Sequence, residues 1–253
     1  MRPRAEFGKE KRTGLARALS KLGFCSRSEA AELVRAGRVR VNGALKRDSE
    51  TPVRLERDQI EVDRRRVRAA LKEYWMLNKP RGIVTTAEDE KGRETVYDLL
   101  PRGTAWIGPV GRLDKASEGL LLMTNDTEWA ARVTAPRSHV DKTYHVQIGA
   151  IADESLVSRL AAGVVDCGEE LKAERARLLR AGEKNCWLEI VLREGKNRQI
   201  RRMLERLGVR VLRLIRVTIG PLRLGDLAKG KARQLTAAER ESLDLALGLR
   251  KNL

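Results

Sequence analysis

One aspartate lies in a glycine-punctuated loop that suits it for chemistry. Residues 108–126 read GPVGRLDKASEGLLLMTND, with Arg112 two positions before Asp114 and Lys115 one position after it. Neighbouring cations keep a carboxylate ionised, as a nucleophile or a general base requires, and glycine lets the backbone approach a ligand closely. An aspartate in such a loop is also commonly a turn residue that binds its own backbone. Spacing alone leaves both interpretations open.

The segments that must position this loop predict strands and helices without a regular alternation. Apolar or alternating runs predict strands at 74–77, 83–86, 119–124, 143–148 and 188–192. A basic helix follows, with Ile200, Met203 and Leu204 on its buried face and Gly208 at its end. This order of elements predicts an α+β domain with a mixed, mostly antiparallel sheet.

A separate small module precedes this domain. Ser26 and Glu29 form a capping box at the start of a helix that ends at Gly37. An alternating strand then meets Asn42-Gly43, which is a strong hairpin signal. We therefore expect four parts, listed here in chain order: a flexible basic arm at 1–12, a module at 13–66, a linker at 67–73 and a catalytic domain at 74–253.

The charge of the chain points to a polyanionic partner. The formal net charge is +17, and its two basic blocks, 1–70 and 193–233, carry net charges of +9 (19 Lys/Arg, 10 Asp/Glu) and +10 (13 and 3). Cationic proteins bind nucleic acid with release of condensed counterions. No apolar run approaches the ~20 residues of a spanning helix, so we expect nucleic acid and no membrane.

The cysteines and histidines favour neither disulfides nor metal. Cys25, Cys167 and Cys186 are far apart in the sequence, with no CxxC pair and with only two histidines in the chain. Sparse, odd cysteines are typical of a reducing compartment. We therefore expect a cytoplasmic protein without a structural zinc site.

The N-terminal module resembles the S4-like αL RNA-binding domain of a small-subunit ribosomal protein and of many RNA-modifying enzymes. The resemblance covers about residues 13–62 and rests on these residues: Leu15, Ala16, Leu19, Gly23, Ser26, Arg27, Glu29, Ala30, Leu33, Gly37, Val39, Val41, Asn42 and Gly43. It implies that Arg27, Arg35, Arg38 and Arg40 lie beside the RNA backbone. Each of these arginines, taken alone, is equally compatible with a solvated surface charge.

The larger domain resembles the bacterial pseudouridine synthases of the ribosomal small- and large-subunit type. Four ordered motifs carry the resemblance: LNKPRG at 77–82, GRLD at 111–114 followed by SEGLL at 117–121, KTY at 142–144, and EGKNRQIRRM at 194–203. It implies the catalytic domain of that family, which isomerises uridine in RNA and needs neither cofactor nor metal.

The same resemblance assigns roles to individual residues. Asp114 becomes the catalytic carboxylate, Tyr144 stacks on the target base, and Arg201 is the basic partner of Asp114. Arg112 helps to fill the space that the flipped base leaves. Further RNA contacts are implied for Lys79, Arg198 and Arg202. Without the resemblance, Tyr144 is an ordinary core position on an alternating strand, and Arg112 and Arg201 are ordinary surface charges. Whether Asp114 acts as a nucleophile or as a base stays open.

The amino-acid sequence of the fourth motif resembles large-subunit members of the family more closely, which favours 23S ribosomal RNA as the substrate. Residues 197–202 read NRQIRR, whereas the small-subunit enzyme typically has a Tyr-His pair before the glutamine. The alternatives are 16S rRNA, and a non-catalytic ribosome-assembly factor that would keep both basic blocks without an aspartate-centred pocket. A nucleotide-binding loop is disfavoured, since the glycines match neither GxGxxG nor a P-loop. We expect a monomer.

Overall fold

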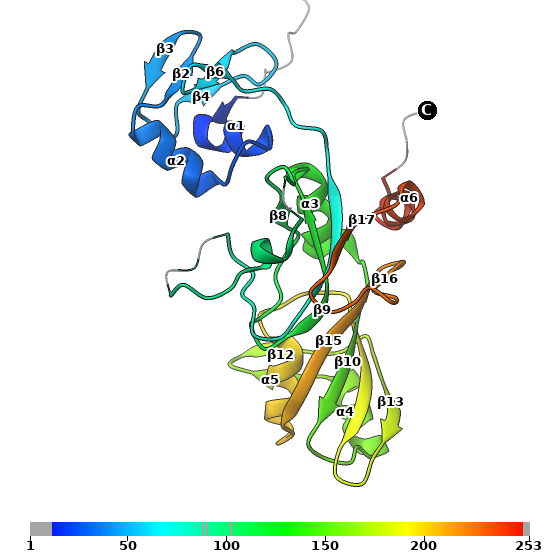
Figure 1. Ribbon diagram of the computed structural model, residues 1–253. Helices are drawn as coiled ribbons and strands as arrows, with labels where there is room; N and C mark the ends of the chain where they lie inside the picture. The colour runs from blue at the N-terminus through cyan, green and yellow to red at the C-terminus, as the bar shows by residue number, and fades with distance from the viewer. Residues whose placement is uncertain (1–11, 88, 90, 102, 250–253) are drawn as a thin grey trace, which may run out of the picture. The chain divides into compact units, whose positions relative to one another are not determined.

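The chain forms two compact units. The computed structural model describes residues 12–249 apart from 88, 90 and 102, so the expected basic arm at 1–12 lies, except for Arg12, outside the described residues. The first unit takes in the chain up to Glu73 together with Gly103–Gly108 and Asn125–Thr127 (blue to cyan in its main part, Figure 1). The second takes in Tyr74–Arg102, Pro109–Thr124 and Glu128–Leu253.

The first unit contains two helices and short strands around one apolar core. Its elements are β1 (Thr13–Gly14), α1 (Leu15–Lys21), α2 (Arg27–Arg35), β2 (Val39–Val41), β3 (Ala44–Lys46), β4 (Pro52–Val53), β5 (Ile60–Val62) and β6 (Arg65–Arg66). Strands β3, β2, β5 and β6 form a sheet in that order, and β1 pairs with β4. The apolar side chains of α1 and α2 pack on Val39, Val41 and Ile60.

Local signals in the sequence predicted this unit well. The hydroxyl of Ser26 accepts a hydrogen bond from the Glu29 amide at 3.1 Å, which caps α2. This is one half of the predicted capping box, which also needs a bond from the Ser26 amide to the Glu29 carboxylate. The hairpin between β2 and β3 turns at Asn42 (φ 51°) and Gly43 (φ 79°). Two consecutive residues with positive φ make the twisted turn that joins antiparallel strands tightly.

A sheet with nine strands is the framework of the second unit. Its strands are β7 (Tyr74–Lys79), β8 (Gly108–Pro109), β9 (Glu118–Thr124), β10 (Lys142–Ile148), β13 (Arg175–Ala181), β14 (Cys186–Leu192), β15 (Val211–Ile219), β16 (Leu222–Arg223) and β17 (Ala232–Gln234). The main order is β13-β14-β10-β15-β9-β7-β17. Strand β15 runs parallel to β9, and the other pairs along this order are antiparallel. The expectation of an α+β fold with a mixed, mostly antiparallel sheet is confirmed.

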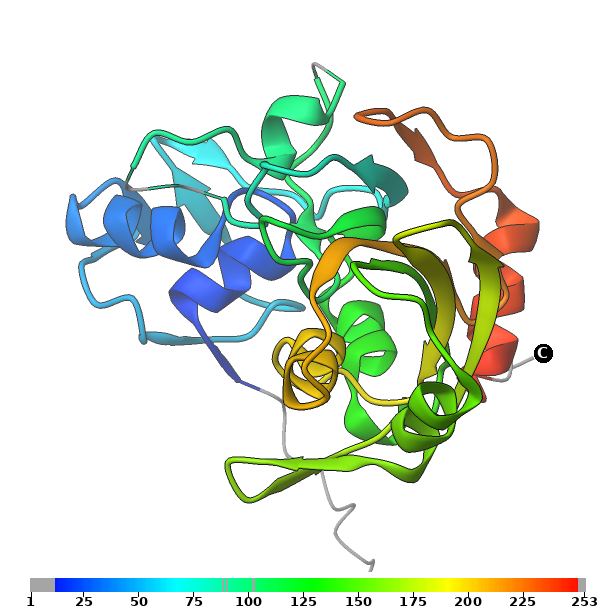
Figure 2. The same ribbon diagram turned by 90° about the horizontal axis from the view of Figure 1, so that it is seen from below.

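Helices and a hairpin complete the second unit. They are η1 (Val96–Leu99), α3 (Thr127–Thr134), η2 (Pro136–Ser138), α4 (Glu154–Ala162), the β11–β12 hairpin (Val164–Asp166, Glu169–Leu171), α5 (Gln199–Arg206) and α6 (Ala237–Ala246). Helices α4 and α5 pack against the same side of β10, β14 and β15 (Figure 2). Apolar residues of α3 and α6 share a second core with β7 and β9. The candidate site lies among α5, β10 and β15.

One predicted strand is wrong. Residues 83–86 have no strand partner except an isolated bridge between Val84 and Thr95. Thr85 instead donates from its hydroxyl to the carbonyl oxygen of Leu113 at 2.8 Å, and the Gly82 amide donates to the carbonyl of Lys115 at 2.8 Å. The β-branched composition predicted sheet pairing, but the segment supports the loop that carries Asp114.

Candidate active site

A cavity of about 430 Å³ opens beside Asp114 in the second unit. Apolar side chains from β14, β15 and α5 form much of its wall, among them Leu192, Leu214, Ile219 and Ile200. The loop from Gly111 to Asp114 and the start of α5 also line it. The cavity therefore combines an apolar wall with a carboxylate and several cations, as expected of a ligand-binding site.

The loop around Asp114 is held by its backbone. Five consecutive carbonyl oxygens, from residue 113 to residue 117, each accept a hydrogen bond from elsewhere in the unit. Their donors, in chain order, are the Thr85 hydroxyl, the Lys79 ammonium, the Gly82 amide, the Arg201 guanidinium and Lys79 again. A loop bound at successive carbonyls has little freedom to shift, so the position of the Asp114 side chain is fixed through its main chain.

Lys79 lies inside the protein and does not reach its surface. Its side chain is fully buried, and its Nζ donates to the carbonyls of Pro80 (3.1 Å), Asp114 (3.2 Å) and Ser117 (3.0 Å). Burial lowers the pKa of Lys79 to about 8, against the opposing influence of Asp114 and Glu118. The prediction that Lys79 contacts RNA is wrong in this structure, because the ammonium is enclosed by the carbonyls that it binds.

Asp114 is paired with Arg198. Its Oδ2 lies 3.6 Å from Nη1 of Arg198, and the two side chains are 40% and 50% exposed. Arg198 is held with a left-handed backbone (φ 50°) immediately before α5. The carboxylate thus keeps an accessible face toward the cavity, as a group that must meet a substrate requires.

Arg201 lines the same cavity, but it donates its hydrogen bonds to the loop. Its Nη2 donates to the carbonyl of Ala116 at 2.9 Å and lies 3.5 Å from the Ser117 hydroxyl. Burial lowers the pKa of Arg201, while the charge of Asp114 acts in the opposite direction. Arg201 therefore interacts with Asp114 through its field, whereas the direct ion pair that the sequence assigned to Arg201 is made by Arg198.

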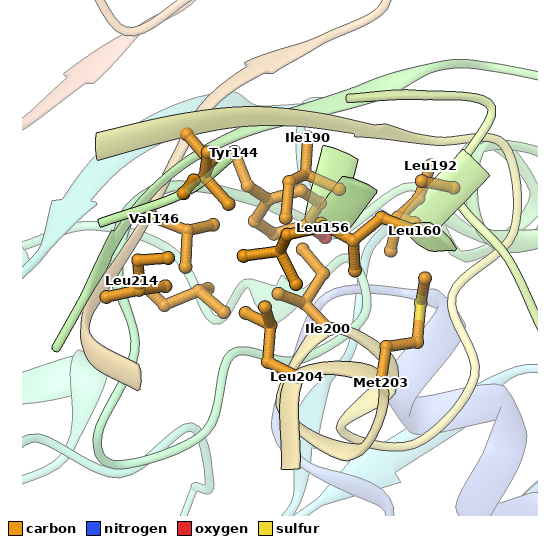
Figure 3. Packing of buried hydrophobic residues seen from close by; sticks show 14 of the residues in the cluster. Tyr144, Val146, Leu156, Leu160, Ile190, Leu192, Ile200, Met203, Leu204 and Leu214 are labelled. Carbon is orange, nitrogen blue, oxygen red and sulfur yellow. The ribbon is translucent and has the colours of Figure 1, made fainter. Parts of the chain in front are cut away.

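Tyr144 belongs to the core and to the cavity wall at once. Its side chain is 8% exposed and packs in the cluster that includes Leu156 and Ile190, as Figure 3 shows, while it also lines the cavity. The core position expected without the resemblance is thus observed, and the contact with the target base stays a prediction. A ring fixed by its neighbours offers a rigid surface to a planar ligand.

Arg112 of the loop and Arg202 of the fourth motif differ in how far their side chains are exposed. Arg112 is exposed and lines the cavity. Arg202 is only 21% exposed; it lies 2.5 Å from Asp166 and 2.8 Å from Glu169, both in the β11–β12 hairpin. The structure thus uses the guanidinium of Arg202 to hold the hairpin on α5, which leaves little of it for the RNA contact expected from the sequence.

The four arginines expected to contact RNA in the first unit are all exposed. Arg38 is engaged with Asp63, with Nε 2.9 Å from Oδ1. Arg35 donates to the carbonyl of Ala31 within α2, and Arg40 donates to the carbonyl of Gly43 at 2.8 Å. Arg27 begins α2. A phosphate that binds Arg38 would therefore have to displace the carboxylate of Asp63.

Sequence reasoning missed Arg216 as part of the site. It is 5% exposed and lines the cavity. The signal was present: in residues 211–219, VLRLIRVTI, a charged residue occupies a position that the apolar pattern assigns to the interior.

Comparisons with known proteins agree with this fold. The model of the RNA pseudouridylate synthase family matches residues 73–206, and that of the S4 domain matches residues 13–60. An uncharacterized RNA pseudouridine synthase of Aquifex aeolicus (strain VF5) is 37% identical over 233 residues, covering 92% of this chain and 94% of its relative. Ribosomal large subunit pseudouridine synthase B of Bacillus subtilis (strain 168) is 37% identical over 228 residues, covering 89% and 93%.

A solved structure supports the same assignment. A crystal structure of a pseudouridylate synthase superposes with a TM-score of 0.65 at 30% identity, covering 91% of this chain and 99% of that chain. The chain therefore belongs to the RNA pseudouridylate synthase family. It is a pseudouridine synthase, an isomerase that acts on RNA, with an S4 domain before its catalytic domain. Within the described residues, no helix is both long and apolar enough to cross a membrane.

Proposed function

We propose that this enzyme isomerises a specific uridine of 23S ribosomal RNA and that Asp114 is its catalytic carboxylate. The observation that carries the proposal is the position of Asp114 in the apolar-walled cavity, on a loop bound at five successive carbonyls. The 37% identity to a relative named as a large-subunit synthase supports the choice of RNA. The NRQIRR sequence of residues 197–202 supports it as well.

The reaction requires the target nucleotide to leave its helix. A stacked base cannot be turned relative to its ribose, so it must be flipped out at a cost of a few kcal/mol. Tyr144 would stack on the flipped ring, a contact worth roughly 1–3 kcal/mol per base. Arg112, exposed at the cavity, would help to fill the gap that the base leaves in the RNA.

Asp114 would then act on the ribose. As a nucleophile its carboxylate attacks C1′, and as a base it removes a ribose proton; both routes free the uracil from C1′. Arg198 balances the negative charge from 3.6 Å, and Arg201 holds the loop in register with α5. The uracil turns and rejoins C1′ through its carbon 5. In the first route the carboxylate leaves C1′ as carbon 5 attacks, and in the second the proton removed from the ribose is returned to it. Carbon 5 then loses its proton and N1 gains one, so the atoms balance.

Tritium release tests the reaction. RNA labelled at uracil carbon 5 loses its label when the new carbon–carbon bond forms, and we expect release by the wild type and none by Asp114→Asn. RNA affinity should stay within about twofold, because phosphate contacts by the basic surfaces dominate it. Activity in a pure Asp114→Asn protein would show that Asp114 is not the catalytic carboxylate.

The preferred transcript tests the substrate. Release from 23S and not from 16S transcripts is the expected result, and the reverse would move the assignment to the small subunit. Tight binding without release from either transcript is to be followed by the same assay on precursor subunits. Release there would identify an assembly intermediate as the substrate. We further infer a monomer in the cytoplasm, which sedimentation and fractionation would test.

A further inference from the structure

Arg216 is a buried cation with unfilled hydrogen-bonding capacity in the wall of the cavity. Its Nε donates to the carbonyl of Leu120 at 2.8 Å, which fixes the guanidinium. Its Nη2 is buried and finds no hydrogen-bond partner among the residues that the structure describes. A guanidinium carries five N–H donors, and leaving buried donors unpaired is costly. The mechanism proposed for Asp114 makes no use of this group.

Regular alternation along β15 places Arg216 on the cavity side, because it lies two residues after Leu214 and pairs with Tyr144, and all three line the cavity. An irregularity in β15 follows immediately and brings Ile219 to the same side. Tyr144 pairs with Arg216 while Thr143 pairs with Thr218, so Val217 is an extra residue between the two pairs. Without this bulge, positions 216 and 219 would face opposite sides of the strand. With it, both line the cavity and both are buried. Bulges commonly re-aim side chains beside active sites.

Lys142 adds a second cation to the same region. It lies two residues before Tyr144 on β10 and lines the cavity, and its Nζ donates to the carbonyl of Val140 at 3.1 Å. Burial, followed by the charge of Arg216, lowers the pKa of Lys142, while Asp141 opposes the change. Lys142 and Arg216 are therefore close enough to repel each other, and both are shielded from solvent. A negatively charged oxygen acceptor between them would reduce this repulsion.

We propose that Arg216 and Lys142 bind the carbonyl oxygens of the flipped uracil and stabilise the negative charge that the base acquires when it leaves C1′. The inference rests on the proposed function. When the bond from N1 to C1′ breaks, its electron pair stays with the uracil and spreads to the oxygens at positions 2 and 4. When carbon 5 attacks C1′, the charge returns to the new bond. Cation donors at those oxygens stabilise this intermediate stage.

The same pair would read the identity of the base. Uracil presents an oxygen acceptor at position 4, where cytosine presents an amino group. A cytosine in this cavity would place its amino group, a hydrogen-bond donor, against the donors of Arg216 or Lys142. These buried donors would stay unpaired, so the site would bind cytosine much more weakly than uracil. Asp114 acts on the sugar, which every ribonucleotide carries, so selection of uridine falls to groups such as Arg216 that face the ring.

Single-turnover tritium release from 23S RNA tests the pair, with Arg216→Gln, Arg216→Lys and Lys142→Gln in the full-length protein. Arg216→Gln should slow the rate at saturating enzyme by about 100-fold, as when one donor is lost from a site of developing charge. The RNA dissociation constant should change by less than about twofold. Arg216→Lys should recover about tenfold of the rate because it keeps a cation donor. Lys142→Gln should fall between Arg216→Gln and the wild type.

A matched control removes the same charge far from the cavity lining. Arg159 of α4 is exposed and outside both basic blocks, and Arg159→Gln should leave the rate unchanged. An Arg216→Gln protein that melts like the wild type and reacts within about threefold of it would overturn the proposal. Weaker RNA binding at an unchanged saturated rate would also overturn it, since the group would then hold a phosphate. If Arg216→Gln does not fold, Lys142→Gln decides by the same criteria. A wild type that releases no tritium would count against the proposed function instead.

Discussion

The buried ammonium of Lys79 donates a hydrogen bond to the main-chain carbonyl of Asp114 at 3.2 Å. It binds the carbonyl of Ser117 as well, at 3.0 Å, so one cation spans the turn that begins at Asp114. The carboxylate of Asp114 remains 40% exposed. The protein therefore fixes the backbone of this residue from inside while leaving its side chain accessible from the cavity, which makes Lys79 a positioning residue.

Replacing Lys79 by methionine should destabilise the second unit and reduce activity. Methionine fills much of the same space but leaves three carbonyls without this donor, and an unsatisfied buried group costs about 1–3 kcal/mol. We expect a loss of at least about 3 kcal/mol in urea unfolding. Lys115→Met, an exposed neighbour in the same loop, should stay within about 0.5 kcal/mol of the wild type. Equal stability of the two variants would contradict this role.

The pH dependence of stability should report the same ammonium. Burial lowers the pKa of Lys79 to about 8 from an ordinary value of 10.5. Between these two values the unfolded chain binds more protons at this site than the folded chain, so the free energy of unfolding rises with pH. The difference in stability between wild type and Lys79→Met should therefore grow as pH increases through this window. A difference that stays flat from pH 8 to 10.5 would show that Lys79 titrates normally.

Replacing Arg198 or Arg201 by glutamine should lower the reaction rate to different extents. Arg201 holds the carbonyl of Ala116 from a partly buried position, whereas Arg198 meets Asp114 in a half-exposed pair. Exposed pairs contribute only about 0–1 kcal/mol. Arg198→Gln should thus lower the saturated rate by less than about fivefold. Arg201→Gln should lower it by about 100-fold, because the loop that carries Asp114 loses a hydrogen bond that holds it in place. Single-turnover kinetics of both variants on one RNA measure the contrast, and a reversed order would make Arg198 the essential partner.

Gly119 should tolerate no side chain. Its φ is +101°, and a Cβ there would lie 2.3 Å from the carbonyl oxygen of Arg216 in the parallel partner strand. Gly168 also has a positive φ, of +78°, but meets nothing within 4 Å. Gly168→Ala should cost about 1 kcal/mol, for backbone strain alone. Gly119→Ala should cost at least about 2 kcal/mol more, because β9 and β15 must separate. Comparable unfolding midpoints would mean that the strands can move apart cheaply.

The arginines of the first unit should contribute to the salt dependence of RNA binding. Each phosphate interaction that Arg27→Gln, Arg35→Gln or Arg40→Gln removes should reduce the slope of log affinity against log salt by about 0.7–0.9. Arg38→Gln should change it less, since Asp63 already neutralises that guanidinium. Filter binding over a range of salt concentrations would measure these slopes. A slope that does not change in any variant would place the RNA contacts elsewhere.

The sequence predicted well wherever a few adjacent residues decide the structure. Asn42-Gly43 made its hairpin and Ser26 capped its helix, because a two-residue turn and a cap depend on local backbone preference. The strand at 119–124 was equally clear from an unbroken apolar run. The family resemblance supplied the positions of Asp114, Tyr144 and Arg201, and the structure brings all three to one cavity.

Contacts between distant segments could not be predicted in the same way. Residues 83–86 look like a strand by composition, yet Thr85 uses its hydroxyl on Leu113, 28 positions away. Lys79 looks like a surface cation until the carbonyls around it are placed. Arg198 and Arg201 are three residues apart at the start of α5, and only the folded structure shows that Arg198 is the one that pairs with Asp114.

By itself, the sequence determined the class of fold, the family and the loop that bears Asp114, because local preference and shared motifs are properties of neighbouring residues. Only the tertiary structure decided which cations face the cavity. Arg216 is placed there by its pairing with Tyr144 of β10, two residues after Leu214. Side chains alternate sides along a strand, so the register that pairs Arg216 with Tyr144 determines that this cation faces the cavity and not the opposite side of the sheet.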